Sequence, residues 1–309
     1  MTLLQAPSAV VMIRPHHFCS NPETRDDNAF QTLADQTAEV TSAQALAEFD
    51  GAVETLRAAG ITVHVFDDTS RDTPDSVFPN NWFSTHAGGH VAVYPMYAPN
   101  RRKERRWDVI ELLKRDYRVQ DVIDYSGLEQ DNLALEGTGA MVLDHIGRIA
   151  YTVKSNRADP VLLERFCTHF NFEPMVFEAK DAAGRDVYHT NVLMGIGTDY
   201  ALICLEMITD PARRAEVKQR LEETGRAVID LTPEQIAGFA GNALELKGRK
   251  RLLALSARAA EVLRPDQIAL IEQSATLLPL NIPTIETAGG SVRCMLAGIH
   301  LSPRERTVS

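Results

Sequence analysis

The chain lacks any long run of apolar residues, and it has no excess of positive charge. No stretch of its 309 residues approaches the roughly 18 apolar residues that a membrane-spanning helix needs. Its start lacks the basic and then apolar order of a signal peptide, so a cytoplasmic location is expected. The formal net charge of −10 disfavours nucleic acid as a partner. The composition therefore agrees with one soluble body that has neither a membrane nor nucleic acid as its partner.

Cysteine is scarce, and its spacing is uninformative. The four cysteines, at positions 19, 167, 204 and 294, show neither the paired spacing of a disulfide framework nor that of a zinc site. No metal is therefore expected. A free cysteine is most often a small buried apolar residue, and this is the prediction for Cys19, Cys167 and Cys204.

What the chain does have is a repeat. Five short motifs recur, with corresponding residues at positions 81, 136, 191, 242 and 294, which are steps of 55, 55, 51 and 52 residues. A period of this kind indicates that one structural unit is copied along the chain. The motifs are Phe78-Pro79-Asn80-Asn81-Trp82, Leu135-Glu136-Gly137-Thr138-Gly139, Tyr188-His189-Thr190-Asn191-Val192, Ala240-Gly241-Asn242-Ala243-Leu244 and Gly289-Gly290-Ser291-Val292-Arg293-Cys294.

The residues around each motif predict the same order of elements. Apolar and β-branched runs that predict strands precede the motifs, at 61–66, 119–123, 174–177, 227–229 and 277–285. Similar runs follow the first four motifs, at 91–94, 148–152, 200–204 and 251–255. Amphipathic segments predict helices between them, at 43–59, 102–115, 160–170, 211–223 and 265–275. The basic run at 101–106 is interpreted as a solvated helix start.

The fifth motif has almost no chain after it, whereas residues 9–14 form a strand-like run that no other unit uses. If this N-terminal strand completes the fifth unit, the ring closes. The prediction is an α/β fold in which a single catalytic domain, residues 1–309, consists of five repeats of strand, strand, helix and strand. Residues far apart in sequence would then meet around one central channel.

Cys294 is the candidate nucleophile among the cysteines. Thiolates attack carbon, and a nearby cation or a polar pocket favours the thiolate. Cys294 follows Gly289 and Gly290, which allow close approach of the backbone, and Arg293 adjoins it. The alternative is a small buried residue without chemistry.

A histidine and a carboxylate recur at the corresponding places. His189 and Asn191 are expected on a strand with their side chains on one face, and a histidine can exchange protons near neutral pH. Glu136 lies between Leu135 and Gly137, on an expected strand without other charges. A carboxylate buried there must be paired or used in chemistry, because burying it alone is costly. A hydrogen-bonded core histidine and a structural salt bridge remain the alternatives.

The order Glu-Gly, His-x-Asn and Gly-Gly-Ser-Val-Arg-Cys-Met resembles that of the guanidine-modifying superfamily, the arginine deiminase and amidinotransferase group with the five-bladed pentein propeller fold. The resemblance covers nearly the whole chain. It is narrower to the citrulline utilization hydrolases, also called arginine deiminase-related, through four segments: Arg14-Pro15, Asn21-Pro22-Glu23-Thr24, Asn28-Ala29-Phe30-Gln31 and Phe78-Pro79-Asn80-Asn81-Trp82.

The resemblance implies a role for each motif residue. Cys294 would be the nucleophile, His189 the general acid and base, and Glu136 the carboxylate that orients the substrate or the histidine. A small-molecule amino-acid substrate is implied, with no metal or organic cofactor, and a homo-oligomer is left open. Candidates for binding the α-amino and α-carboxylate groups are Arg14, Asn28 and Arg293, although a strand at Cys294 would point Arg293 to the opposite face.

The chain departs from the deiminases at two positions. Arginine deiminases usually carry aspartates where Asn81 and Asn191 stand here, and such carboxylates grip a cationic guanidinium. A carboxamide offers a donor as well as an acceptor, so a pair of them suits a neutral ureido group. The leading hypothesis is therefore hydrolysis of citrulline to ornithine, ammonia and carbon dioxide through a covalent cysteine adduct.

Other activities stay open. Arginine dihydrolase or deiminase action is the second hypothesis, and dimethylarginine hydrolysis and amidinotransfer are weaker ones. A binding or regulatory module is the alternative from another class, because one fold can host unrelated functions. The joint presence of Glu136, His189 and Cys294 counts against that alternative.

Overall fold

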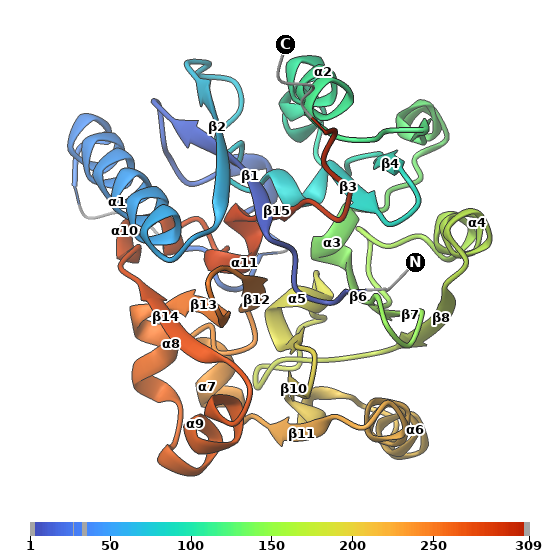
Figure 1. Ribbon diagram of the computed structural model, residues 1–309. Coiled ribbons are helices and arrows are strands. Elements are labelled where there is room, and N and C mark those ends of the chain that lie inside the picture. The colour runs from blue at the N-terminus through green and yellow to red at the C-terminus, as the bar shows by residue number, and fades with distance from the viewer. Residues whose placement is uncertain (1–3, 27, 33–35, 306–309) are drawn as a thin grey trace.

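Five small mixed sheets stand around a central axis in the computed structural model, which describes residues 4–26, 28–32 and 36–305 (Figure 1). Within these residues each sheet has three strands. Long helices lie on the outside of the ring, and four one-turn helical segments lie near its centre (Figure 1). No helix in the described part of the chain is both long and apolar enough to cross a bilayer.

Each sheet is built in the same way. A short first strand pairs antiparallel with the middle strand, which pairs parallel with a third strand after a crossover through a helix. The first strands are β3 (Phe83–His86), β6 (Met141–Asp144), β9 (Met194–Ile196), β12 (Leu244–Lys247) and β15 (Ala297–Gly298). The middle strands are β4 (His90–Val93), β7 (Ile149–Val153), β10 (Tyr200–Ile203), β13 (Arg251–Ser256) and β1 (Ala9–Pro15). The third strands are β5 (Asp121–Asp124), β8 (Glu173–Phe177), β11 (Ala227–Asp230), β14 (Thr276–Leu280) and β2 (Thr62–Asp68).

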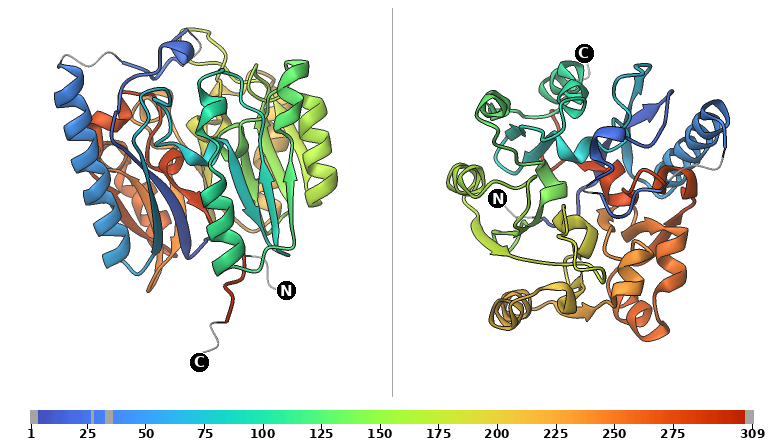
Figure 2. Two further views of the ribbon diagram at one scale, coloured as in Figure 1. Left: turned by 90° about the horizontal axis from the view of Figure 1, so that it is seen from above. Right: turned by 180° about the vertical axis from the view of Figure 1, so that it is seen from behind.

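The two ends of the chain complete one sheet together. The N-terminal β1 pairs antiparallel with the C-terminal β15 and parallel with β2. The predicted closure of the fifth unit by residues 9–14 is therefore confirmed. Figure 2 shows the described ends of the chain at one face of the ring, and the segment around the short η1 turn (Pro22–Thr24) at the other.

The crossover helices cover the outer side of the sheets, and their limits follow local signals. They are α1 (Ala38–Ala58), α2 (Trp107–Asp116), α4 (Pro160–Phe170), α6 (Pro211–Glu223), and α8 (Ala257–Val262) with α9 (Pro265–Glu272). The Asp159 side chain accepts hydrogen bonds from the first backbone amides of α4, Pro160 follows it, and Asn171 ends the helix in a left-handed conformation at φ 53°. These signals explain why the sequence places α4 and α6 at their observed limits.

Elsewhere the structure corrects the expected elements. The run at 277–285 is not one strand, because β14 ends at Leu280 and α10 (Pro283–Glu286) follows Ile282. The predicted helix at 102–115 is divided into the short η3 turn (Arg101–Glu104) and α2. Arg101 and Glu104 are 2 % and 3 % exposed, so the interpretation of this run as a solvated helix start is wrong for them. Cys19 is exposed, against expectation, whereas Cys167 and Cys204 are buried.

Among the described residues, four apolar clusters lie between the sheets and their helices and between neighbouring sheets. The largest joins the sheets of β7 and β10 through residues such as Tyr151, Leu202 and Ile229. Burial of this apolar area is the main favourable term in folding. The motif residues therefore sit on a ring of sheets whose own interiors are packed.

One buried ion pair joins two neighbouring sheets. The Arg226 guanidinium donates from Nη1 and Nη2 to the Asp144 carboxylate at 2.6 and 2.9 Å, and Nε donates to the Gly197 carbonyl at 2.8 Å. Both side chains of the ion pair are at most 1 % exposed. The Asp144 carboxylate also accepts from the amides of Ile146 and Gly147. This pair therefore connects β6 to the start of β11.

We predict that Asp144→Asn lowers the free energy of unfolding by about 3–5 kcal/mol, because it leaves the Arg226 charge buried without its partner. Asp121→Asn is the matched control, since the Asp121 side chain is 48 % exposed and pairs only with His90. It should cost less than about 1 kcal/mol. Urea denaturation of both variants measures the difference, and equal losses would contradict the assignment.

Candidate active site

The motifs form short turns at the centre of the ring. Four of the five are one-turn helical segments, each directly before the first strand of its sheet or one residue from it: η2 (Pro79–Asn81), α3 (Gly137–Ala140), α5 (Thr190–Leu193) and α11 (Val292–Met295). The motif at 240–244 is a turn without a helix, which leads into β12. Turn η2 packs against α3 and α11, and α3 packs against α5. Figure 1 shows the three helices meeting near the axis. The expectation of motif strands is wrong, and one-turn helices take their place.

Cys294 lies in α11 and is 4 % exposed. Its Sγ accepts hydrogen bonds from Asn191 Nδ2 at 3.1 Å and from Asn242 Nδ2 at 3.2 Å. The backbone amide of Cys294 donates to Asn242 Oδ1 at 3.4 Å. Two amide donors aimed at one sulfur stabilise negative charge on it.

Glu136 and His189 form a buried pair. Glu136 Oε2 lies 2.7 Å from His189 Nε2, and Oε1 accepts from the backbone amide of Tyr97 at 3.0 Å. The guanidinium groups of Arg157 and Arg101 lie 3.6 and 3.7 Å from the same carboxylate, whose side chain is fully buried. The carboxylate therefore holds the imidazole by Nε2 and leaves Nδ1 for other partners.

The pKa values of Glu136 and His189 are both lowered, for different reasons. Burial alone raises the pKa of Glu136, but Arg157, His189 and Arg101 outweigh it and hold this pKa well below its usual range. Burial lowers the pKa of His189, and the hydrogen bond and charge of Glu136 oppose that shift only in part. At neutral pH the pair therefore consists of a carboxylate and a neutral imidazole.

A small cavity connects the thiol with the imidazole. Its volume is about 20 Å³, room for about one water molecule, so an amino acid can enter only if the cavity widens. It is lined by Asn28, Asp75, Phe78, Asn81, Arg101, Arg157, Tyr188, His189, Ala288, Gly290 and Cys294. In the described part of the chain no three His, Cys, Asp or Glu side chains are grouped so that they could hold a metal ion.

Asp75 is a further carboxylate in this cavity. Its Oδ2 accepts from Asn21 Nδ2 at 2.7 Å and lies 3.7 Å from Arg101 Nε. Its Oδ1 is buried and has no hydrogen-bond partner among the described residues. Burial raises the pKa of Asp75, although Arg101 and the hydrogen bond from Asn21 oppose the shift. This oxygen can therefore receive a hydrogen bond from a cationic ligand.

The sequence pattern of the family described as "N,N dimethylarginine dimethylhydrolase, eukaryotic" matches residues 14–301 of the chain. The chain belongs to this family. It is therefore a member of the guanidine-modifying superfamily of hydrolases that act on carbon–nitrogen bonds other than peptide bonds. No curated protein matches the chain.

Solved structures of guanidine-modifying enzymes share the fold. The N-terminal domain of ArgZ, "an arginine dihydrolase from the Ornithine-Ammonia Cycle in Cyanobacteria", is 16 % identical over 94 % of this chain and 97 % of that chain, with a TM-score of 0.71. Unliganded AgrE is 16 % identical over 96 % of this chain and 40 % of its own, with a TM-score of 0.73. A dimethylarginine dimethylaminohydrolase adduct is 12 % identical over 95 % and 100 %, with a TM-score of 0.66. These likenesses show the pentein fold.

The structure of this family member brings most of the predicted residues together. Cys294, His189, Asn81 and Asn28 line the cavity, and Glu136 contacts it through His189. His189 is extended at φ −135° and precedes α5, so it does not share a strand face with Asn191 as expected.

Two predicted substrate anchors lie elsewhere. Arg14 pairs with Asp50 and Asp67 at the surface, at 2.8 and 2.9 Å, because β1 directs it away from the axis. Arg293 lines a different cavity, since it lies on another side of the α11 turn from Cys294. The structure therefore does not bring Arg14 or Arg293 to the cavity that Cys294 and His189 line.

The predicted pair of carboxamides does not form. The Asn191 amide is directed at the thiol of Cys294. With its oxygen turned toward Arg101, the Asn81 carboxamide accepts from Nη1 and Nη2 at 3.0 and 3.1 Å, and donates to Asn80 Oδ1 at 3.3 Å. Only Asn81 of the two lines the cavity. The structure therefore does not place the two carboxamides where both could bind one neutral ureido group.

Four polar residues of this site were not predicted from the sequence: Asp75, Arg101, Arg157 and Asn242. Asn242 stands in the fourth motif and could have been found from the repeat alone. Arg101 is followed three residues later by Glu104, and the two form a buried ion pair at 2.9 Å. That spacing within a mixed-charge run was a signal for a folded turn. Asp75 and Arg157 had no sequence signal.

We predict that His189 titrates below pH 6.5 and that Glu136→Gln lowers its pKa further. The carboxylate of Glu136 favours the imidazolium, so its removal leaves burial unopposed. Glu129→Gln is the control, because Glu129 pairs with Arg105 and does not contact His189. NMR titration of the His189 ring against pH measures each value. A pKa above 6.5, or a rise in the Glu136 variant, would refute this account.

We also predict that Gly139→Ala lowers kcat/KM for hydrolysis by about 10²-fold while the protein still folds. A Cβ at position 139 would lie 2.0 Å from the Asn81 carboxamide and 2.9 Å from His189 Nδ1, so both must move. Gly51→Ala is the control, because that position has open space around it and lies in α1. Steady-state kinetics with a guanidino substrate measures the effect; unchanged kinetics in the Gly139 variant would contradict it.

Proposed function

We propose that this chain is a cysteine hydrolase that attacks the guanidino carbon of an arginine-derived amino acid. The observation that supports this most is the convergence of three groups on one buried cavity: the Cys294 thiol with its two amide donors, the Glu136–His189 pair, and the charged residues Asp75, Arg101 and Arg157. Dimethylarginine, the substrate in the name of the family, carries such a carbon.

The first half of the reaction forms a bond between sulfur and carbon. Asn191 and Asn242 hold the sulfur by their amide groups, and the thiolate adds to the planar guanidino carbon. Nδ1 of the neutral His189 takes the proton of the Cys294 thiol as the sulfur adds to the carbon. The resulting imidazolium gives this proton to the leaving nitrogen, which departs as an amine and leaves a covalent thiouronium adduct on Cys294. Glu136 fixes the ring through Nε2, so Nδ1 is the nitrogen that transfers the proton.

The second half uses the same imidazole as a base. His189 takes a proton from a water molecule, and the hydroxide adds to the adduct carbon. Collapse of this intermediate breaks the carbon–sulfur bond and releases a ureido product. The reaction needs no metal or organic cofactor, because the atoms that move are a nucleophile, a proton and a water molecule.

The charged residues of the cavity can bind the amino-acid end of the substrate or its guanidinium. Two guanidinium groups, those of Arg101 and Arg157, line the wall and suit a carboxylate. The unpartnered Asp75 Oδ1 suits a cationic ammonium or guanidinium group. These residues replace Arg14 and Arg293 as candidate anchors, and Asn28 remains one because it also lines the cavity.

Hydrolysis of citrulline to ornithine, ammonia and carbon dioxide is the second candidate. Asn81 favours it, because it lines the cavity and its amide nitrogen has a second N–H, besides the one that points at Asn80, that can donate to the oxygen of a neutral ureido group. Attack on the ureido carbon would release ammonia and leave a thiocarbamate on Cys294. Water would then release a carbamate that loses carbon dioxide. An enzyme that carries out both reactions would be an arginine dihydrolase.

We further propose that the activity resides in a single catalytic domain of five repeats, residues 1–309, in the cytoplasm. Assembly of this domain into a homo-oligomer is compatible with the proposed reaction, since every catalytic group named here comes from one chain.

The test is to incubate the protein separately with arginine, asymmetric dimethylarginine and citrulline, and to quantify citrulline, ornithine, ammonia and dimethylamine. We expect citrulline, or ornithine, from at least one guanidino substrate, and no product with Cys294→Ala. Ornithine from citrulline alone would overturn the guanidino preference in favour of the ureido reaction. Product formation by Cys294→Ala at the wild-type rate would overturn the proposed nucleophile.

A second variant tests the anchors. Asp75→Asn should raise KM by about tenfold or more with a smaller effect on kcat, because it removes a charge that contacts a cationic group of the substrate away from the sulfur. Asp72→Asn is the control, since Asp72 is exposed and pairs only with Lys103 at 3.5 Å. A loss in kcat alone for Asp75→Asn would assign Asp75 to the chemical step instead.

A further inference from the structure

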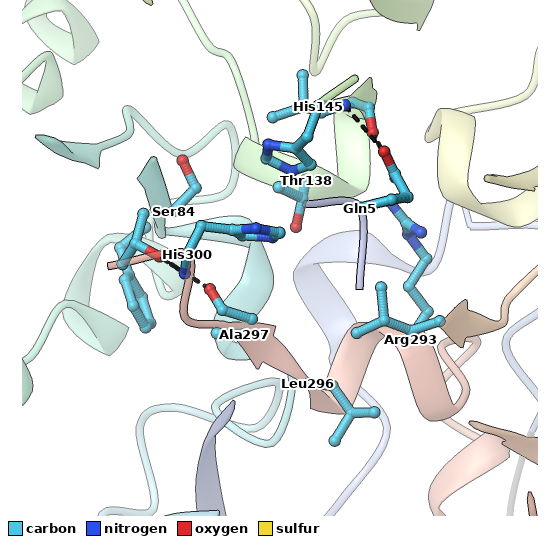
Figure 3. A pocket seen from close by; sticks show the side chains of 13 residues that line it. Gln5, Ser84, Thr138, His145, Arg293, Leu296, Ala297 and His300 are labelled. Carbon is cyan, nitrogen blue, oxygen red and sulfur yellow. Dashed lines mark hydrogen bonds between the residues drawn. The ribbon is translucent and has the colours of Figure 1, made fainter. Parts of the chain in front are cut away.

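A second cavity is lined by residues from both ends of the described chain, with Gln5 near one end and Gly298 and His300 near the other (Figure 3). Its volume is about 40 Å³. The polar side chains in its wall are those of Gln5, Ser84, Thr85, Thr138, His145, Arg293 and His300. Figure 3 shows that Arg293 and His300 approach the same space from different sides, with Thr138 and His145 nearby. The proposed reaction uses none of these side chains.

Arg293 differs from the other buried arginines. Four arginines are less than 9 % exposed among the described residues, namely Arg101, Arg157, Arg226 and Arg293. The first three have a carboxylate within 4.0 Å, from Glu104, Glu136 and Asp144 respectively. No such carboxylate is found near Arg293 in the described part of the chain, and no Asp or Glu lines its cavity.

The hydrogen bonds of Arg293 are also incomplete. Its Nη1 donates to the Ala243 carbonyl at 3.4 Å, a long contact, and its buried Nε has no partner among the described residues. Burial lowers the pKa of Arg293 to about 10, and the charge of the neighbouring Cys294 thiolate opposes this shift only in part, so the guanidinium is still charged at neutral pH. A buried charge without a counter-charge or full hydrogen bonding is costly. The cavity therefore offers a cation that requires an anion.

The other groups in the wall can assist an anion. The rings of His145 and His300 are stacked with centroids 3.8 Å apart. Burial lowers the pKa of both, so each ring is neutral at neutral pH and carries one N–H donor. Gln5, by contrast, is occupied, since Nε2 donates to the Leu143 carbonyl and Oε1 accepts from the His145 amide.

We propose that this cavity is a binding site for a small inorganic anion, held by the Arg293 guanidinium with the His145 ring beside it. A larger cavity of about 280 Å³ shares His145 and His300 with it and has Lys247 in its wall, which provides a path of favourable charge from solvent. The anion would compensate the buried charge of Arg293, in the same turn that holds Cys294.

The test measures binding of sodium phosphate, sodium bicarbonate and sodium chloride in separate titrations at constant ionic strength, by calorimetry and by the shift in Tm. We expect saturable binding of at least one anion, and Arg293→Gln should weaken it by about tenfold or more. Arg118→Gln is the matched control, because it removes the same charge from a side chain that is 62 % exposed. Equal binding by the wild type and the Arg293 variant, or no saturable binding, would overturn the proposal.

The position of a bound anion in crystals tests the proposed site even if Arg293→Gln fails to fold. Crystals of the unchanged protein grown in sodium bromide should show an anomalous peak within hydrogen-bond distance of the Arg293 guanidinium. Peaks confined to surface lysines would overturn the proposal. Neither experiment uses an amino-acid substrate, so their failure would leave the proposed hydrolase reaction untouched.

Discussion

The buried carboxylate of Glu136 is the interaction on which the arrangement of the site depends. It contacts His189 at 2.7 Å and lies within 4.0 Å of Arg101 and Arg157. These groups come from three different repeats. A carboxylate without them would be expensive to bury, and each arginine would in turn lose its counter-charge. The chemistry of the imidazole and the fit of three units around the axis are therefore linked by one charged group.

One turn of the ring contributes side chains to two cavities. Cys294 and Arg293 are neighbours in the single turn of α11, and their side chains line different cavities. Cys294 faces the cavity with His189, and Arg293 faces the cavity with His145 and His300. Turn α11 thus supplies a candidate nucleophile to one cavity, and to the other a guanidinium that has no carboxylate partner among the described residues.

The extent to which the site could be predicted varies from residue to residue. Cys294, His189 and Glu136 were found because the repeat places them in phase and because each is chemically unusual beside glycines or apolar residues. Asn191 was found for the wrong reason, since its amide meets the sulfur instead of the substrate. Arg101 was missed because a run of exposed and buried cations looks uniform in sequence, and only the turn at η3 separates them.

The sequence by itself determined the period, the order of elements in each unit and the closure of the ring by residues 9–14, because hydrophobic period and capping residues act locally. Only the tertiary structure decided which way each motif side chain points, because a one-turn helix and a strand direct neighbouring residues differently. It also decided which charges are paired. Asp75 and Arg157 lie in the site and Arg14 lies outside it, because each is held by an ion pair with a residue distant in sequence.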